Sequence, residues 1–419
     1  MNILIFEDNF HSNLSPLSIL RPVYDIVTGV YTNRERLEEF LPSKYKLSLH
    51  CRNLLLPLVK SENPGKKINQ IDKDDYLFIN GSIVYDEGFI LWMLKKMKVN
   101  SVLMNEGKAI VAKVSKDKLT YLKHKIENEN IDNSLYTNDF DYLELFEDKE
   151  IIEKYSVLNI NYPWDIIKYF DTVLVKDLFN KSANKKKGNL HSKVSAVNLK
   201  NIRIAKSANI YPNVVLDADA GMICIDEKAV IEPFSYIKGP VYIGKNVLVK
   251  SGTKIYGPCS FGTGCKISGE ISGSIFHSNV NKQHDGFIGN SYACPFVNFG
   301  ADTVTSNLKN NYSKIRVKFG TEQINTDMQF LGTITGDHAK FGINTMLNTG
   351  TIVGIYANVA GGGFPNKQID SFSWNILGSQ PTRYKLEEAL ATAKVVMARR
   401  HNEMSKEYEE LVREIFKSV

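Results

Sequence analysis

The sequence lacks the features that would assign the protein to a membrane or to the cell exterior. No apolar run approaches the roughly 20 residues that a membrane-spanning helix needs. The first residues lead directly into Glu7 and Asp8, without a cationic leader or a cleavage site. The chain has five cysteines, and none of them shows CxxC spacing, which argues against a disulfide framework. We therefore expect a cytoplasmic protein without a membrane segment.

A large excess of charge of one sign is also absent. The chain has 52 basic and 46 acidic side chains, a net charge of +6. The basic residues are dispersed, unlike those of a nucleic-acid-binding groove. The exception is the run Lys185, Lys186 and Lys187, which we interpret as part of a solvated linker. The mild positive bias suits small anionic substrates such as sugar phosphates or nucleotides.

A period of six residues runs through the second half of the chain. Neither an α-helix nor a plain strand has this period, whereas a hexapeptide β-helix does. The uninterrupted apolar set comprises Ile225, Ile231, Ile237, Ile243, Val249, Ile255, Phe261 and Ile267. Three extra residues separate it from an earlier set, Ile204, Ile210 and Leu216. The period resumes at Phe341, Leu347, Val353 and Val359.

The hexads predict a triangular prism in which three hexads make one coil and each apolar residue points inward. Turn formers such as Pro212-Asn213 and Gly244-Lys245-Asn246 stand between the apolar positions. A β-sandwich is the alternative, but alternating strands do not produce strict sixes. Between residues 268 and 340 the period is irregular, and residues 277–286 predict a polar excursion from the wall. Such loops often carry functional sites.

The chain is predicted to contain an α/β domain at residues 1–179, a linker at 180–193, the β-helix at 194–380 and a final helix at 381–419. Strands alternate with helices in the first domain, which is typical of a largely parallel sheet. The expected strands are residues 3–6, 76–79 and 101–104, the last forming a hairpin with residues 109–112. The expected helices are residues 25–41, 89–97 and 165–179. In the last segment, Thr382 is expected to cap one long amphipathic helix.

Three segments resemble the GlmU-like family, bifunctional UDP-N-acetylglucosamine pyrophosphorylases and glucosamine-1-phosphate N-acetyltransferases. Residues 14–25 resemble the N-termini of a divergent bacterial branch, and residues 281–290 and 299–307 resemble two acetyltransferase motifs. The resemblance implies a Rossmann-like nucleotidyltransferase domain followed by a left-handed parallel β-helix. It also implies a homotrimer whose partners are a sugar phosphate, a nucleotide and acetyl-CoA.

The first domain departs from the family at its phosphate loop. Residues 7–13 replace the Gly-rich half of the loop, so Arg21 is the nearest basic group and an acidic pair is expected to face the triphosphate. Asn80 and Gly81 match the substrate-binding segment after a strand, but Ser82 replaces the first metal-binding Asp. Asn161 matches the second ligand for Mg²⁺. Nucleotidyl transfer with Mg²⁺ is therefore one hypothesis, and a weak nucleotide-sugar site or a scaffold is the alternative.

The second domain matches the family more fully. His284 falls at the position of the catalytic base, and Asn307 at a position that orients the base or the sugar. An imidazole with an ordinary pKa near 6.5 can deprotonate an amino-sugar ammonium. The alternative is that His284 is a loop histidine closing hydrogen bonds. The resemblance implies further residues: Gly300, Ala301, Ile343 and Ala360 for acetyl-CoA, and Lys250 and Lys254 for the substrate phosphate.

The leading hypothesis is an enzyme of sugar-nucleotide or cell-envelope precursor synthesis. It would transfer acetyl from acetyl-CoA to an amino-sugar phosphate, transfer a nucleotidyl group to a sugar 1-phosphate, or both. One alternative keeps only nucleotidyl transfer, with the β-helix as trimerisation platform. Another is a non-catalytic sugar-nucleotide-binding scaffold.

Overall fold

The computed structural model describes residues 1–130, 133–182 and 190–419, so the run Lys185–Lys187 lies outside the described residues. The chain divides into two compact units. One comprises Met1–Asp165 with Ser405–Ile415, and the other comprises Ile166–Met404 with Phe416–Val419. No helix in the described part of the chain is both long and apolar enough to cross a bilayer.

The first unit is built around a six-stranded sheet in the order β2-β1-β3-β6-β5-β7. Strand β1 is parallel to β2 and β3, and β5 is parallel to β7, but β6 runs antiparallel to both β3 and β5. The predicted hairpin is thereby confirmed, and the sheet is mixed rather than largely parallel. The strands of the unit are β1 Asn2–Phe6, β2 Leu47–Leu49, β3 Tyr76–Asn80, β4 Ile83–Val84, β5 Ser101–Asn105, β6 Lys108–Val114, β7 Glu144–Glu147 and β8 Leu158–Asn159.

The first unit contains more helices than the sequence predicted, and one of the expected helices begins later than predicted. Its helices are α1 Asn33–Phe40, α2 Leu56–Glu62, α3 Glu87–Lys95, α4 Thr120–Glu127 and α5 Lys149–Lys154. The helix expected over residues 25–41 begins only at Asn33, because the Thr32 side chain accepts a hydrogen bond from the Glu35 amide and Glu35 bonds back to Thr32. This capping box sets the start of the helix. Helix α6, Pro163–Ser182, spans the division between the two units.

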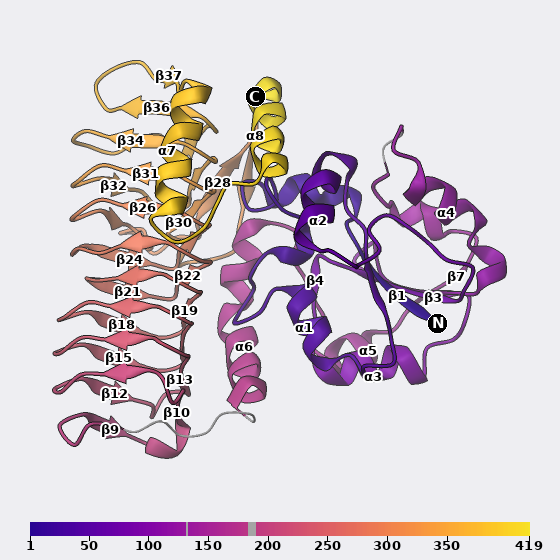
Figure 1. Ribbon diagram of the computed structural model, residues 1–419, viewed down its shortest axis with the longest axis horizontal. Coiled ribbons are helices and arrows are strands. Elements are labelled where there is room, and N and C mark those ends of the chain that lie inside the picture. Colours follow the sequence, from indigo (N-terminus) through magenta and orange to yellow (C-terminus); the bar gives the residue numbers. More distant parts are fainter. Residues whose placement is uncertain (131–132, 183–189) are drawn as a thin grey trace. The chain divides into compact units, whose positions relative to one another are not determined.

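The second unit is a left-handed parallel β-helix whose strands stack as rungs (Figure 1). Its first sheet contains β10 Ile202–Ile204, β13 Ile223–Ile225, β16 Val241–Ile243, β19 Cys259–Phe261, β22 Ile275–Phe276, β25 Tyr292–Ala293, β30 Thr333–Thr335, β33 Thr351–Val353 and β35 Gln368–Ile369. The second contains β11 Asn209–Ile210, β14 Val230–Ile231, β17 Leu248–Val249, β20 Lys266–Ile267, β23 Asn281–Lys282, β26 Asn298–Phe299, β31 Lys340–Phe341, β34 Asn358–Ala360, β36 Ser373–Ile376 and β37 Thr382–Arg383. The third contains β9 Ser195–Val197, β12 Val215–Asp217, β15 Tyr236–Lys238, β18 Lys254–Tyr256, β21 Glu270–Ser272 and β24 Phe287–Gly289, and continues as β27 Val304–Thr305 with β32 Met346–Leu347.

The hexads form the core of this prism. Every member of the uninterrupted set is fully buried. Val241 pairs with Ile223 one coil earlier and with Cys259 one coil later, a spacing of three hexads on either side. The predicted turns hold as well, since Asn213 and Asn246 have φ of 65° and 57°. This left-handed conformation is one that asparagine tolerates better than most residues.

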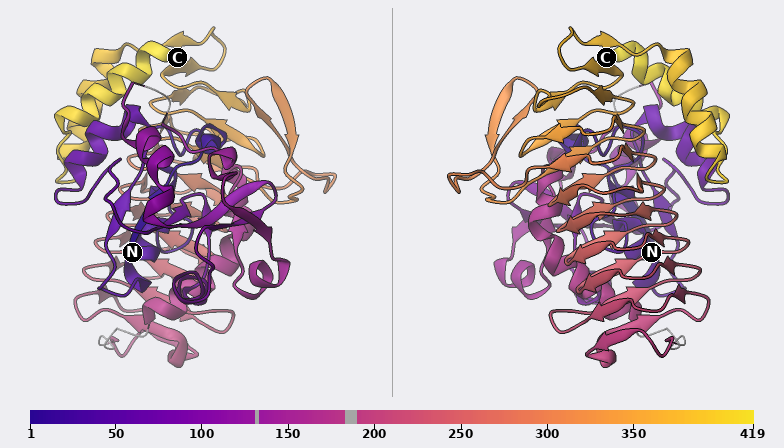
Figure 2. Two further views of the ribbon diagram at one scale, coloured as in Figure 1. Left: turned by 90° about the vertical axis from the view of Figure 1, so that its right-hand side faces the viewer. Right: turned by 90° about the vertical axis from the view of Figure 1, so that its left-hand side faces the viewer.

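The irregular stretch contains shortened coils and one long excursion. Residues 277–286 do not leave the wall, because β23 pairs with β20 before it and β26 after it. The excursion lies instead between β27 and β30 and carries the antiparallel hairpin of β28 Arg316–Phe319 and β29 Glu322–Asn325 (Figure 2). Sequence reasoning placed it too early because a lysine, not an apolar residue, takes the inward position in β23.

The C-terminal segment forms two helices rather than the single one expected. Thr382 belongs to β37, and the helices are α7 Leu386–Ala398 and α8 Lys406–Ser418. Helix α7 ends where His401 adopts a φ of 56° and the Asn402 amide donates to the Met397 carbonyl at 3.0 Å. At the same point Arg400 donates to the Gly264 carbonyl at 3.2 Å, which attaches the helix end to the β-helix wall.

Candidate functional site

The turn that carries His284 joins β23 to β24. The His284 side chain is exposed, and its imidazole makes no hydrogen bond or ion pair to any residue that the structure describes. Two residues on, Gly286 has a φ of 115°, and a Cβ there would meet the Thr303 carbonyl oxygen at 2.2 Å. Only glycine fits this close approach of two coils. The turn therefore presents an available imidazole on a tightly packed backbone.

Lys282 fixes this turn from inside the prism. It stands in register with Ile267 of the coil before, is fully buried, and donates from Nζ to the carbonyl oxygens of His284 and, at 2.6 Å, Asp285. Burial lowers the pKa of Lys282 to about 8, and the charges of Asp285 and Asp302 oppose that shift. Sequence reasoning missed Lys282; the signal was a lysine where the apolar period should continue.

Asn307 lies beside the motif of His284 but does not bond to its ring. Its Nδ2 donates to Oδ1 of Asn290 at 2.8 Å. A Cβ on Gly289 would lie 2.6 Å from Asn307 Nδ2 and 2.5 Å from the Phe287 ring. The structure thus brings Asn307, Phe287 and Asn290 together around Gly289, and no hydrogen bond among the described residues links Asn307 to His284.

The predicted acetyl-CoA residues line up at one corner of the prism, the corner that also carries His284. Gly300 and Ala301 follow β26, Ile343 follows β31, and Ala360 ends β34 on three successive coils. A Cβ on Gly300 would meet the Gly342 carbonyl carbon at 2.6 Å, so the coils touch closely here. Ile343 exposes 69% of its surface. The result is a column of small residues with one exposed apolar side chain.

The predicted phosphate-binding lysines lie farther from His284. Lys250 belongs to the same corner two coils earlier, and its Nζ forms an ion pair with Glu232 at 3.1 Å. Lys254 faces outward on the third sheet, in the column that continues through Glu270 to Phe287. Two coils correspond to about 10 Å. Neither lysine contacts the His284 turn.

In the first unit, the acidic pair after β1 turns inward. Glu7 is fully buried, forms an ion pair with Arg52 at 2.6 Å, and accepts hydrogen bonds from the Val23 and Arg52 amides at 3.0 Å each. Asp8 caps a short 3-10 helix, Asn9–Leu14, by accepting from the Phe10 amide. The expected repulsion between Glu7 and a triphosphate does not arise, because Arg52 already compensates this carboxylate.

A buried polar cluster forms where β1 and β3 end. Oδ2 of Asp8 accepts from Asn80 Nδ2 at 2.9 Å and from Ser82 Oγ at 3.4 Å. The Lys108 ammonium lies 3.7 Å from the same oxygen and 4.7 Å from the centroid of the Phe10 ring. Lys108 is buried, and its Nζ has no hydrogen-bond partner among the described residues. Sequence reasoning missed both Asp8 as the centre of this cluster and Lys108.

The other predicted residues of the first domain surround this cluster. Gly81 is enclosed, since a Cβ would lie 2.9 Å from Tyr24 Cβ and 3.0 Å from the Phe6 carbonyl oxygen. Asn161 follows β8, whose pairing with β4 brings it to the same end of the segment as Gly81, and its amide donates to Asp165 at 2.8 Å. Arg21 donates to the Leu17 carbonyl at 2.8 Å.

The donors at this cluster do not fit a Mg²⁺ ion that bridges phosphates. Magnesium prefers carboxylate and water oxygens in octahedral geometry. The two positions that would supply ligands hold Ser82 and Asn161, which are neutral. The carboxylate of Asp8 is already hydrogen-bonded, and the Lys108 ammonium beside it would repel a divalent cation. No group of three or more His, Cys, Asp or Glu side chains suited to a metal occurs in the described residues.

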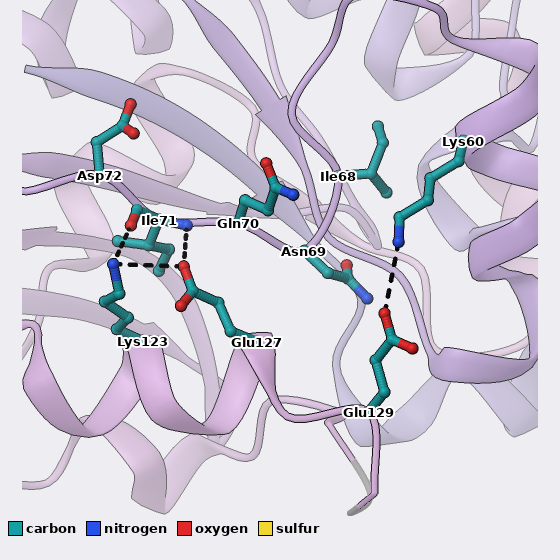
Figure 3. A pocket seen from close by; sticks show the side chains of 9 residues that line it. All are labelled: Lys60, Ile68, Asn69, Gln70, Ile71, Asp72, Lys123, Glu127 and Glu129. Carbon is teal, nitrogen blue, oxygen red and sulfur yellow. Dashed lines mark hydrogen bonds and ion pairs between the residues drawn. The ribbon is translucent and has the colours of Figure 1, made fainter.

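One pocket of the first unit lies apart from all these residues (Figure 3). It has a volume of about 390 Å³; each lysine of its wall lies beside a carboxylate of the same wall, and Asp72 pairs with Lys67 outside it. Lys123 and Glu127 lie 3.5 Å apart, and Lys60 and Glu129 lie 3.4 Å apart. The pocket therefore holds no charge that would call for a charged ligand.

The comparisons with known proteins agree with this architecture. Residues 3–186 match the family described as sugar nucleotidyl transferase. The bifunctional protein GlmU of Methanococcus aeolicus is 24% identical over 412 residues, which cover 86% of this chain and 90% of that protein. Residues 3–186 therefore resemble sugar nucleotidyl transferases, and most of the chain is similar to GlmU.

Other similarities of this GlmU-like chain are partial. The bifunctional sugar-1-phosphate nucleotidylyltransferase/acetyltransferase of Sulfurisphaera tokodaii is 28% identical over 153 residues, 32% of this chain but only 38% of that protein. The crystal structure of the polySia-specific acetyltransferase NeuO has 14% identity and a TM-score of 0.26, covering 48% of this chain and 87% of that one. The predicted family, fold class and assignment to the transferases are confirmed.

Proposed function

We propose that the β-helix transfers the acetyl group of acetyl-CoA to the amine of an amino-sugar phosphate, with His284 as the base. The observation that carries the proposal is the exposed, unbonded His284 imidazole at the same prism corner as Gly300, Ala301, Ile343 and Ala360. The names of the relatives support it, since two of them are bifunctional proteins and one name includes acetyltransferase. The place of the enzyme is then sugar-nucleotide biosynthesis.

The chemistry requires a proton acceptor beside the amine. His284 accepts a proton from the substrate ammonium, and the free amine attacks the thioester carbonyl carbon. A C–N bond forms, the C–S bond breaks, and the coenzyme A thiolate takes up a proton as the product leaves. Asn307 and Asn290 offer amide groups that can bind the sugar hydroxyls. Lys250 and Lys254 are the candidates for the substrate phosphate, after rotation of their long side chains.

The test is acetyl transfer from acetyl-CoA to glucosamine 1-phosphate, followed through the released thiol. His284→Ala is expected to lower kcat at least a hundredfold, which is the usual contribution of a general base (about 10² to 10⁴). His191→Ala is the matched control, because His191 is exposed and lies in the same unit shortly before the first strand of the β-helix. A His284→Ala variant as active as the control would refute the role of His284.

A second function is supported by the family match of residues 3–186. We propose that the first unit binds a nucleotide or nucleotide sugar at the end of β1 and β3, and that Lys108 supplies the positive charge there without Mg²⁺. Binding of UDP-N-acetylglucosamine, measured by calorimetry, is then expected to be equal in EDTA and in Mg²⁺. Lys108→Met is expected to weaken it about tenfold, the loss of one charge-assisted contact. A strict Mg²⁺ requirement would contradict this assignment.

We further propose that the chain acts as a homotrimer in the cytoplasm. Its five cysteines are buried and form no disulfide among the described residues, as expected in a reducing compartment. Light scattering should give three times the 47.3 kDa mass of the chain. A mass of one chain would exclude a site completed by a neighbouring copy.

A further inference from the structure

A second pocket lies wholly within the second unit, between the wall of the β-helix and the end of α7. Its volume is about 370 Å³. The wall contributes the outward side chains of four successive rungs of the second sheet, paired in register as Lys266, Asn281, Asn298 and Lys340. This wall is therefore a ladder in which two amide side chains separate two lysines.

The charge of this pocket has one sign only. Arg399 and Arg400 at the end of α7 join Lys266 and Lys340, and no described residue that lines the pocket is acidic. This contrasts with the pocket of Figure 3, in which each cation has a carboxylate partner. Four cations that share one cavity repel one another unless an anion joins them.

The cations have few partners inside the protein. Neither Lys266 nor Arg399 forms an ion pair with any residue the structure describes, and Lys340 donates only to the His338 carbonyl, at 2.9 Å. Burial lowers the pKa of Lys340 to about 8. Burial, followed by the charges of Arg400 and Arg399, also lowers the pKa of Lys266. The charged forms of Lys266 and Lys340 are therefore destabilised in the free protein, and an anion between them would recover part of that free energy.

Three hydrogen bonds centred on Asn281 connect the wall of the pocket to the end of α7. Arg400 donates from Nη2 to Asn281 Oδ1 at 3.0 Å, and Asn281 donates from Nδ2 to Asn298 Oδ1 at 2.7 Å. Gln283 also donates to Asn281 Oδ1, at 2.8 Å. The amide ladder thus keeps the guanidinium of α7 at the wall while the remaining cations stay available.

We propose that this pocket binds the phosphate groups of a small phosphorylated molecule. Its four cations match a pyrophosphate or a phosphate ester with two or more negative charges, and its volume accommodates such a group with part of the attached molecule. The proposal does not rest on acetyl transfer at His284. Gln283, which lines the pocket, is next to His284 in the chain.

The test is calorimetric titration of the full-length protein with inorganic pyrophosphate in low salt. The variant Lys266→Gln/Arg399→Gln removes two cations that make no ion pair, and is expected to weaken binding at least tenfold. The control Lys206→Gln removes an exposed lysine of the same unit and is expected to bind like the wild type. Thermal unfolding midpoints within a few degrees of the wild type would show that the double variant is folded.

A competition arm identifies the source of the phosphate. If coenzyme A displaces pyrophosphate, the pocket holds the phosphates of the coenzyme; if it does not, the ligand is another phosphate ester. Absence of saturable pyrophosphate binding to the wild type would overturn the proposal, and an acidic surface of another copy would then be the partner of these cations. Equal affinities of the double variant and the wild type would also overturn it.

Discussion

Lys282 shows how one inward-facing residue can fix the conformation of a neighbouring turn. An inward position of the prism normally holds an aliphatic or aromatic side chain, as Ile267 and Phe299 do in the neighbouring rungs. A buried ammonium costs free energy unless it is bonded, and here two carbonyl oxygens of the next turn accept its protons. The consequence is a turn held from inside, with the His284 imidazole directed away from the core.

Replacing Lys282 with Met should therefore affect catalysis more than binding. The loss of two charge-assisted hydrogen bonds leaves the His284 and Asp285 carbonyls without their donor, so the turn loses its fixed position. We expect kcat of acetyl transfer to fall about tenfold while KM for acetyl-CoA changes little. Steady-state kinetics with Lys206→Met as the control measures this, and a variant changed only in KM would contradict it.

The buried Lys340 ammonium should make the free energy of unfolding depend on pH. Its pKa of about 8 in the folded chain lies below the ordinary 10.5. Between these values the unfolded chain binds more protons than the folded one, so stability should rise with pH from about 8 to about 10.5. Lys340→Met lacks this burial cost and should be more stable than the wild type at pH 7, by no more than about 3 kcal/mol.

Urea unfolding of both proteins at pH 7 and pH 10 checks this. The advantage of Lys340→Met should shrink at the higher pH, because the wild-type lysine is then neutral in the folded state. If Lys340→Met were more stable than the wild type by the same amount at pH 7 and at pH 10, Lys340 would not be the titrating group.

Among the elements, the rungs of the β-helix follow most directly from the sequence. A residue such as Ile255 is fully buried between Ile237 and Ile271 of the adjacent coils. Truncation of Ile255 to Ala should reduce the free energy of unfolding by about 2 to 5 kcal/mol, because a close-packed prism cannot collapse around the cavity. The control is Lys254→Ala, next to it but outward-facing, which should cost less than about 0.5 kcal/mol.

The same elements show what could be read from the chain and what could not. The hexads predicted the inward residues, the three-residue insertion and the turns, because the period reports burial directly. Lys282 in the register of β23 broke the pattern, so the excursion was placed before β24 instead of at β28 and β29. The two C-terminal helices share one apolar period, and the break between them, with His401 at positive φ and Arg400 bonded to the wall, left no signal in that period.

The site residues also differ in whether a local sequence pattern could reveal them. His284, Gly300, Ile343 and Ala360 were predicted from the family resemblance, and the coils stack them at one corner of the prism, while their roles stay predictions. Lys108 was not found, because it meets Asp8 only through the pairing of β3 with β6. Contacts made by sheet pairing between distant segments carry no local pattern.

At the scale of the whole molecule, the proposal assigns separate chemistry to the two units. The β-helix has an available base beside a column of small residues, whereas the first unit has a lysine and neutral donors where a metal site would need carboxylates. The central proposal is that the β-helix transfers an acetyl group and that the first unit binds its nucleotide without Mg²⁺.

The most direct measurement of this claim is a two-readout assay on the full-length protein. Glucosamine 1-phosphate and acetyl-CoA are added first and thiol is followed; UTP and Mg²⁺ are then added and pyrophosphate is followed. We predict thiol release that His284→Ala abolishes, with no pyrophosphate. Pyrophosphate formation without thiol release would contradict the account and make the β-helix a scaffold for nucleotidyl transfer.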